Sequence, residues 1–357
     1  MRKPNKIGHF FIILILIMLS SAICLSAGCM CTRKEKVAPI VPPGKTDAET
    51  FFICTENSNH YNPRIDGEFV VWQDERNGNM DIYGFDLSTK SEFPICTNES
   101  KQEHVAISGN IIIWVDHRKR SSDYDIYGYD LSDKSEFFIT SIRKPTGPWR
   151  GPDINENFIV WEDDRESYWE KYGYDISGYD LKTGMQFSIC ANPSEQACPK
   201  VSGNIIVWTD FRNGSGDIYG YNLSTKAEFP ICTNEAYQGW AEICDNIVVW
   251  QDERNGNMDI YGYNLSTGTE FPICTELHKQ NKPHVGGTTV VWEDERHSWW
   301  EEELNYWFYG YDLSKEKEFP IARYETIFGI QDFSDGIIVY YDIEEELYEN
   351  IVGLILP

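Results

Sequence analysis

A unit that recurs every 42 to 48 residues constrains the fold of this chain more than any other feature. Its first clear copy reads FVVWQDERNGNMDIYGFDLSTKSEFPICT, residues 69–97. The copies align on one aromatic position, occupied by Trp72, Trp114, Trp161, Trp208, Trp250, Trp292 and Tyr340. A period of this length with strand-like content is typical of propeller blades.

Each unit contains four candidate strands. The first is short and ends seven residues before the aromatic residue, at Ile65, Ile107, Ile154, Val201, Ile243, Val285 and Phe333. The second runs into the aromatic residue and is apolar on both faces, as a strand between neighbouring sheets must be. The third resembles residues 81–87 and is rich in β-formers. The fourth resembles residues 92–96, where Pro94 is tolerated only on an edge strand.

The two ends of the repeat predict how the ring closes. The seventh unit supplies three strands, near Phe333, at 337–340 and near 351–356, and then the chain ends. Residues 51–54 form a fourth strand with no blade before them, and Cys54 precedes Trp72 by the same 18 residues that separate Cys96 from Trp114. We therefore predict an all-β, seven-bladed β-propeller over 51–357, with four-stranded blades and the last blade closed by the N-terminal strand.

The repeat resembles that of a known group of propellers. The pattern V-W-x-D-x-R-N-G-N-x-D-I-Y stands at Val71–Tyr83 and again at Val249–Tyr261. It is similar to the repeat of TolB-like propellers and of propeller domains of archaeal cell-surface proteins. The resemblance implies a protein-docking platform, and occasionally a lyase or a hydrolase gate, since one fold serves several functions.

The N-terminal segment reads as an export signal. Three basic residues precede an apolar run from Phe10 to Leu19, and small residues follow up to Cys29. Residues 25–29, LSAGC, resemble a lipobox, so we expect a signal peptide over 1–28, lipid attachment at Cys29 and a polar tether over 29–50. An uncleaved signal-anchor helix is the alternative, because the apolar stretch is near the length that spans a bilayer. Both predict an extracytoplasmic, membrane-anchored protein at the cell surface or in the periplasm.

The net charge limits the partners. The formal charge is −26 at pH 7, and such a surface repels phosphate backbones, which bind through Lys and Arg. Nucleic acid is therefore excluded as a partner. We expect a protein or a glycan at the cell surface, and the membrane through the lipid anchor.

Residues repeated in every blade are interpreted as scaffold. An Asp follows the aromatic residue by two positions in all seven units, and in six of them an Arg follows that Asp by two more. Such pairs can bridge blades or cap turns. Residues 77–81, NGNMD, fit a hairpin turn better than a calcium loop, because Met80 and Arg76 interrupt the ligand pattern.

The ten cysteines do not form a disulfide framework by spacing. Five recur on successive fourth strands, where equivalent points are too far apart to bridge, and we interpret them as buried small residues: Cys54, Cys96, Cys190, Cys232 and Cys274. Pairing of Cys190 with Cys198, or of Cys232 with Cys244, stays open.

Catalytic motifs are sparse. The sequence has no G-x-S-x-G elbow and no C-x-x-C pair. His60, His104 and His284 stand near the start of first strands, which line the channel, and propeller lyases that resemble this fold hold a metal there by histidine. We interpret the three as polar channel lining, and we assign no catalytic residue, metal or cofactor.

The tryptophans outside the repeated position predict a binding face. Trp149 and Trp240 are placed between fourth and first strands, and four others between second and third strands, on the same side of the disk; the full set is Trp149, Trp169, Trp240, Trp299, Trp300 and Trp307. Packing of the long loops on one another is the alternative. The sequence thus favours a non-catalytic binding or scaffold protein that is not an enzyme. The alternative is a carbohydrate-active enzyme of polysaccharide lyase type with a site in the channel.

Overall fold

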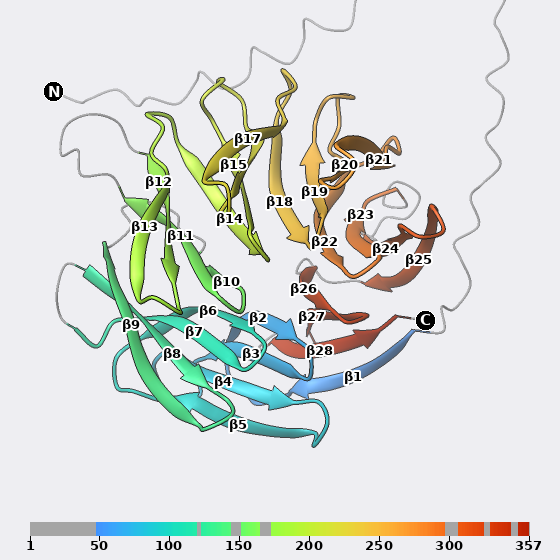
Figure 1. The fold of residues 1–357 in the computed structure, drawn as a ribbon. Helices are drawn as coiled ribbons and strands as arrows, with labels where there is room; N and C mark the ends of the chain where they lie inside the picture. Colours follow the sequence, from blue (N-terminus) through green and yellow to red (C-terminus); the bar gives the residue numbers. More distant parts are fainter. Residues whose placement is uncertain are drawn as a thin grey trace, which may run out of the picture. The chain divides into compact units, whose positions relative to one another are not determined.

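The computed structural model describes residues 48–119, 123–143, 151–164, 173–296, 306–324, 329–343 and 349–356. These residues form seven four-stranded antiparallel sheets arranged as the blades of a ring, seen along the channel in Figure 1. The described part of the chain contains strands and turns but no helix. The prediction of an all-β, seven-bladed propeller is confirmed.

The strands repeat the same order in every blade, from the channel outward. First strands are β2 (His60–Asp66), β6 (Gln102–Ser108), β10 (Asp153–Ile154), β14 (Gln196–Ser202), β18 (Gln238–Cys244), β22 (Gln280–Gly286) and β26 (Ile330–Ser334). Second strands are β3 (Phe69–Asp74), β7 (Ile111–Asp116), β11 (Phe158–Asp164), β15 (Ile205–Asp210), β19 (Ile247–Asp252), β23 (Thr289–Asp294) and β27 (Ile337–Ile343). Third strands are β4 (Asp81–Asp86), β8 (Asp123–Asp130), β12 (Tyr174–Asp180), β16 (Asp217–Asn222), β20 (Asp259–Asn264), β24 (Tyr306–Asp312) and β28 (Glu349–Ile355). Fourth strands are β5 (Ser91–Cys96), β9 (Ser135–Arg143), β13 (Met185–Cys190), β17 (Ala227–Cys232), β21 (Thr269–Cys274), β25 (Lys317–Tyr324) and β1 (Glu49–Cys54).

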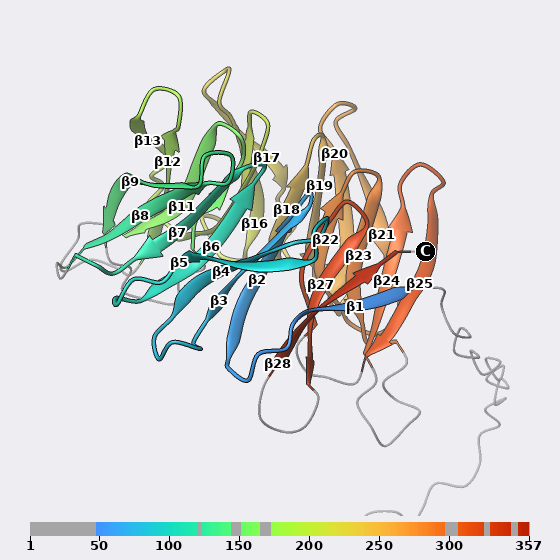
Figure 2. The ribbon, with the colours of Figure 1, turned by 90° about the horizontal axis from the view of Figure 1, so that it is seen from below.

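The N-terminal strand closes the ring, as predicted. β1 pairs antiparallel with β28, with Phe51 opposite Gly353 and Cys54 opposite Ile351. In both views β1, in blue, lies beside the red C-terminal strands (Figures 1 and 2). β1 begins at Glu49, two residues before the expected boundary, and residues 1–47, with Cys29 and nearly all of the expected tether, lie outside the described residues. Pairing of the two ends removes an edge that could otherwise recruit another strand.

The six repeated tryptophans are fully buried between blades. Five of them donate an indole N–H to the Asp two residues later, at 2.9–3.0 Å, as Trp208 does to Asp210. The Arg two residues further pairs with that Asp, with a Glu of the fourth strand and with the fourth-strand Cys of the preceding blade, as Arg212 does with Asp210, Glu228 and Cys190. These contacts link neighbouring blades, so the scaffold interpretation of the pair agrees with the geometry.

The turns and cysteines also follow the sequence. Asn77 and Asn79 donate their side-chain amides to the carboxylate of Asp81, which closes the hairpin, and Gly78 has a φ of 90°. Fourth-strand cysteines are buried, and the seven described cysteines are free thiols. Neither Cys190 with Cys198 nor Cys232 with Cys244 forms a disulfide. No helix among the described residues has the length and apolarity to cross a membrane.

Candidate functional site in the central channel

A bulge in the first strands turns side chains into the channel. The pairing of β2, β6, β14, β18 and β22 with their second strands skips residues at the same place in each blade. One skipped residue in each has a positive φ, between 48° and 56°: Asn62, His104, Cys198, Trp240 and Lys282. Bulges re-aim side chains and occur beside functional sites. We call these five residues the bulge ring.

Two cavities lie along the channel. One, of about 360 Å³, is lined by the bulge ring and by His284. The other, of about 570 Å³, lies further along the first strands and includes Asp332. Four charged residues line both cavities: Arg64, Asp153, Lys200 and Glu242. We call these four the waist, because they stand where the two cavities meet.

The carboxylates of the waist surround Lys200. Its ammonium lies 3.0 Å from Glu242 and 3.7 Å from Asp153. Burial raises the pKa of both carboxyls above the ordinary values, although Lys200 opposes that shift. Burial also acts to lower the pKa of Lys200, but the two carboxylates outweigh it and the pKa is raised. Lys200 is therefore a cation whose charge is already balanced.

Arg64 is the second cation of the waist, and its charge is not balanced by an ion pair among the described residues. Within the described residues its guanidinium forms no ion pair, and it is half-buried. The neighbouring carboxylate, Asp332, instead accepts the backbone N–H of Ile65 at 3.0 Å and lies 3.8 Å from His284. A partly desolvated guanidinium with free donors is suited to bidentate recognition of a carboxylate.

Two imidazoles line the smaller cavity, both neutral at neutral pH. Burial lowers the pKa of His104 below its usual value, and it lowers that of His284 to about 3. A Cβ on Gly151 would lie 2.5 Å from the Cβ of His104, so the glycine allows this histidine to pack against it. A neutral imidazole can accept a proton from a bound substrate.

Trp240 is the exposed aromatic side chain of the same cavity. It is 39% exposed, although Gln238, Gly239 and Ala241 around it in β18 are buried. Its φ of 56° lies in the left-handed region, which is unusual for a bulky residue. Strained backbone of this kind persists where the surroundings enforce it, and it clusters at binding sites.

The predicted tryptophan face falls partly outside the structure. Trp149, Trp169, Trp299 and Trp300 are not among the described residues. Trp240 lies in β18 rather than in a connection, and it lines the channel. Trp307 was placed in a loop, and this is wrong: it lies within β24, 6% exposed, beside Tyr309. Trp307 pairs with Asp294 as Asp81 pairs with Asp74, so it stands at the position where third strands begin. The binding role of the six tryptophans stays a prediction.

The structure places the three histidines in two different environments. His104 and His284 line the channel as expected, whereas His60 is 1% exposed and lies beside Cys54 and Asp74. None of those three residues lines either cavity.

Sequence reasoning missed the waist. A signal was present, because one repeat position carries six different residue types in seven blades: Arg64, Ala106, Asp153, Lys200, Glu242, His284 and Asp332.

Comparison with known proteins finds likeness only in structure. No protein-family model matches the sequence, and no curated protein matches it. The fold is similar to an oligogalacturonate lyase solved in complex with manganese, with TM-score 0.65, 13% identity, and coverage of 88% of this chain and 94% of that one. A second oligogalacturonate lyase, from Vibrio parahaemolyticus, gives TM-score 0.67 and 11% identity over 87% and 97%. The propeller domain of the trilobed protease from Pyrococcus furiosus gives 0.62 and 14% over 84% and 93%.

These likenesses establish the propeller fold, whereas the closer resemblance to TolB-like propellers stays a prediction. The resemblance to propeller domains of archaeal cell-surface proteins stays a prediction, as do the localisation and the lipid anchor. The prediction that the chain is not an enzyme is corrected. Solved enzymes share this propeller over nearly their whole length, so a repeat without motifs does not argue against catalysis.

Proposed function

We propose that this chain is a carbohydrate-active enzyme of polysaccharide lyase type, which binds a uronate-bearing oligosaccharide in the central channel. The observation that carries the proposal is Arg64, a half-buried cation without an ion pair among the described residues, in the same cavity as Trp240, His104 and His284. The structural likeness to two oligogalacturonate lyases supports this chemistry, and galacturonate is the first substrate to test.

Recognition follows from two different surfaces of a uronate. Arg64 binds the carboxylate through paired N–H donors, as guanidinium groups do. Trp240 offers an aromatic face to the apolar side of the sugar ring. The protein carries a formal charge of −26, so a local unpaired cation is needed to hold an anionic ligand.

The reaction is a β-elimination. His104, neutral at pH 7, takes the proton from C5 of the uronate, and its bond electrons form the C4=C5 double bond. The C4–O bond breaks and its electrons stay on the leaving oxygen, which takes a proton from water. Arg64 stabilises the negative charge that builds on the uronate carboxylate during proton removal.

One of the similar lyases was solved with manganese, so the fit of a metal to this channel matters. Among the described residues, three donors of His, Cys, Asp or Glu converge at Cys54, His60 and Asp74, which do not line the channel. The channel's own donors do not form such a group within the described residues. We therefore assign charge neutralisation to Arg64 and derive no step through a metal.

The test is an assay of the purified protein with polygalacturonate and other uronate polysaccharides. Elimination creates a conjugated double bond, so ultraviolet absorbance reports turnover directly. We expect Arg64→Gln and His104→Ala to reduce turnover by at least about 100-fold, the usual scale for a lost general base or oxyanion donor. Lys182→Gln removes an exposed cation on the β12–β13 turn and is the matched control, expected to leave turnover unchanged.

Two results would overturn the proposal. One is the absence of turnover together with the absence of binding of galacturonate oligomers by calorimetry. The other is turnover that Arg64→Gln and Lys182→Gln affect equally. Binding without turnover would reject the lyase chemistry while keeping the channel as a carbohydrate site.

A further inference from the structure

The repeat departs from its own pattern where the N-terminal strand meets the first blade. In four other blades a buried Gln begins the first strand opposite the repeated Asp: Gln102, Gln196, Gln238 and Gln280. Each donates its side-chain amide to the backbone carbonyl two residues earlier. His60 takes this place in the first blade, opposite Asp74.

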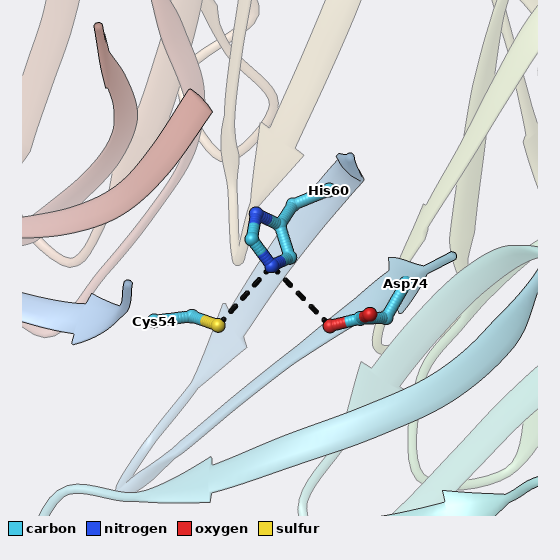
Figure 3. Close-up of side chains that lie close together, drawn as sticks. All are labelled: Cys54, His60 and Asp74. Carbon is cyan, nitrogen blue, oxygen red and sulfur yellow. Dashed lines mark hydrogen bonds and ion pairs between the residues drawn. The ribbon is translucent and has the colours of Figure 1, made fainter. Parts of the chain in front are cut away.

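The histidine creates a group of donors that has no counterpart in the other blades among the residues that the structure describes. Its Nε2 lies 3.2 Å from Sγ of Cys54, 3.3 Å from Oδ2 of Asp74 and 3.2 Å from Oγ of Ser58. Figure 3 shows the Cys54, His60 and Asp74 side chains pointing toward one another from β1, β2 and β3. The ligand atoms of these three residues all lie within 4.8 Å of one another.

Three polar atoms lie close to one nitrogen in this cluster. An imidazole Nε2 carries at most one hydrogen, so it can donate to one neighbour or accept from one. Tetrahedral zinc with thiolate, imidazole and carboxylate ligands has bonds of about 2.0–2.3 Å, which places neighbouring ligand atoms about 3.3–3.7 Å apart. The measured separations of 3.2 and 3.3 Å are close to that spacing.

The burial of the cluster also suits a bound divalent cation. The Asp74 carboxylate accepts hydrogen bonds from the indole N–H of Trp72 at 2.9 Å and from the guanidinium of Arg76. Arg76 also contacts Sγ of Cys54 at 3.4 Å, so the cation would share the negative charges of the thiolate and the carboxylate with Arg76. Cys54, His60, Asp74 and Ser58 are each at most 8% exposed, so a metal held there would be sealed from solvent.

We propose that Cys54, His60 and Asp74 form a zinc-type metal site, with the Ser58 hydroxyl beside it. The thiolate selects a borderline or soft divalent ion over magnesium or calcium. The site joins β1, the strand that completes the last blade, to β2 and β3 of the first blade. Its role is structural: it fixes the closing strand to the blade next to it. This inference does not depend on the lyase proposal.

Cobalt(II) is the probe, because thiolate ligation gives a near-ultraviolet charge-transfer band and tetrahedral geometry gives strong visible bands. Since the cluster is buried, the full chain is unfolded with chelator and refolded with Co²⁺. His60→Gln restores the residue of the other blades, so it should fold. Cys232→Ser is the matched control, because Cys232 contacts Arg254 as Cys54 contacts Arg76 but has Gln238 in place of a histidine.

We expect the natural sequence and Cys232→Ser to bind one Co²⁺ per chain with both sets of bands. Cys54→Ser should lose the charge-transfer band, and His60→Gln should bind at least about 100-fold more weakly, with unchanged circular dichroism. The variants share all other cysteines, so the differences report this cluster. The proposal fails if the natural sequence shows no charge-transfer band, or if the band survives His60→Gln.

Discussion

At the scale of residues, uniformity and divergence within the repeat separate scaffold from site. Asp210 and Arg212 have counterparts with the same contacts in four other blades, so they serve the blade. The waist occupies one repeat position that carries Arg64, Asp153, Lys200 and Glu242 in different blades. Because the charges that line the channel differ between blades, the channel can recognise a ligand that does not share the symmetry of the ring.

Replacement of Trp240 should change the stability of the fold and the affinity for the ligand in opposite directions. Replacement by Gly removes the side chain from a position with a φ of 56°, where a β-carbon costs about 1–2 kcal/mol. We therefore expect Trp240→Gly to unfold at the same or a higher temperature, and to bind galacturonate oligomers at least about 10-fold more weakly. Melting by calorimetry and titration of the same samples check both. Weaker stability together with unchanged binding would show that the side chain is only packing.

His284 should make the fold sensitive to acid. Its pKa is about 3 in the folded protein, lowered by burial and by Lys200, Arg64 and Lys282 against the opposing charge of Asp332, and about 6.5 when unfolded. The unfolded chain therefore binds more protons between these values, so stability falls as pH drops through that window. The slope it contributes is at most about 1.4 kcal/mol per pH unit.

Denaturant unfolding at pH 7, 6, 5 and 4 measures this slope. His284→Gln should flatten it. An equal slope in the natural sequence and in His284→Gln would contradict the assignment.

At the scale of elements, the sequence identified every blade but not every strand boundary. Alternating turns and apolar runs repeat seven times, so the register of each sheet was predictable, including the pairing of β1 with β28. Trp307 belongs to β24 because it pairs with Asp294 as Asp81 pairs with Asp74, and alignment of Tyr309 with Tyr83 would have placed it in the strand. The bulges were also missed, since no glycine marks them at His104 or Trp240.

Removal of β1 should expose the edge of β28. Deletion of residues 49–54 leaves Gly353 and Ile351 without their pairing partners. We expect a melting temperature lower by several degrees, a broader transition and association through the free edge, because unpaired strands recruit others. Deletion of residues 32–46 is the control and should change none of these. An unchanged transition after loss of 49–54 would contradict closure by β1. Size-exclusion chromatography and calorimetry distinguish the outcomes.

At the scale of the whole molecule, the fold was predictable and the function was not. Seven copies of one unit determine a ring, but the ligand depends on seven first-strand positions whose convergence appears only once the ring is built. The cluster of Cys54, His60 and Asp74 likewise depends on β1 returning to complete the last blade beside the first.

Anchoring of the molecule is a separate prediction from the sequence. If Cys29 carries lipid, Cys29→Ser should move the protein from the membrane pellet to the soluble fraction, since acyl chains supply the attachment. Fractionation with immunoblotting measures this. Retention in the pellet would favour an uncleaved signal-anchor helix.

The central claim is that the channel holds a uronate-bearing ligand between Arg64 and Trp240. A crystal structure with a galacturonate trimer, using the inactive His104→Ala variant, tests it most directly. The account predicts a sugar carboxylate in bidentate contact with the Arg64 guanidinium and a sugar ring against Trp240. A trimer bound outside the channel, or an empty channel at saturating trimer, would contradict it.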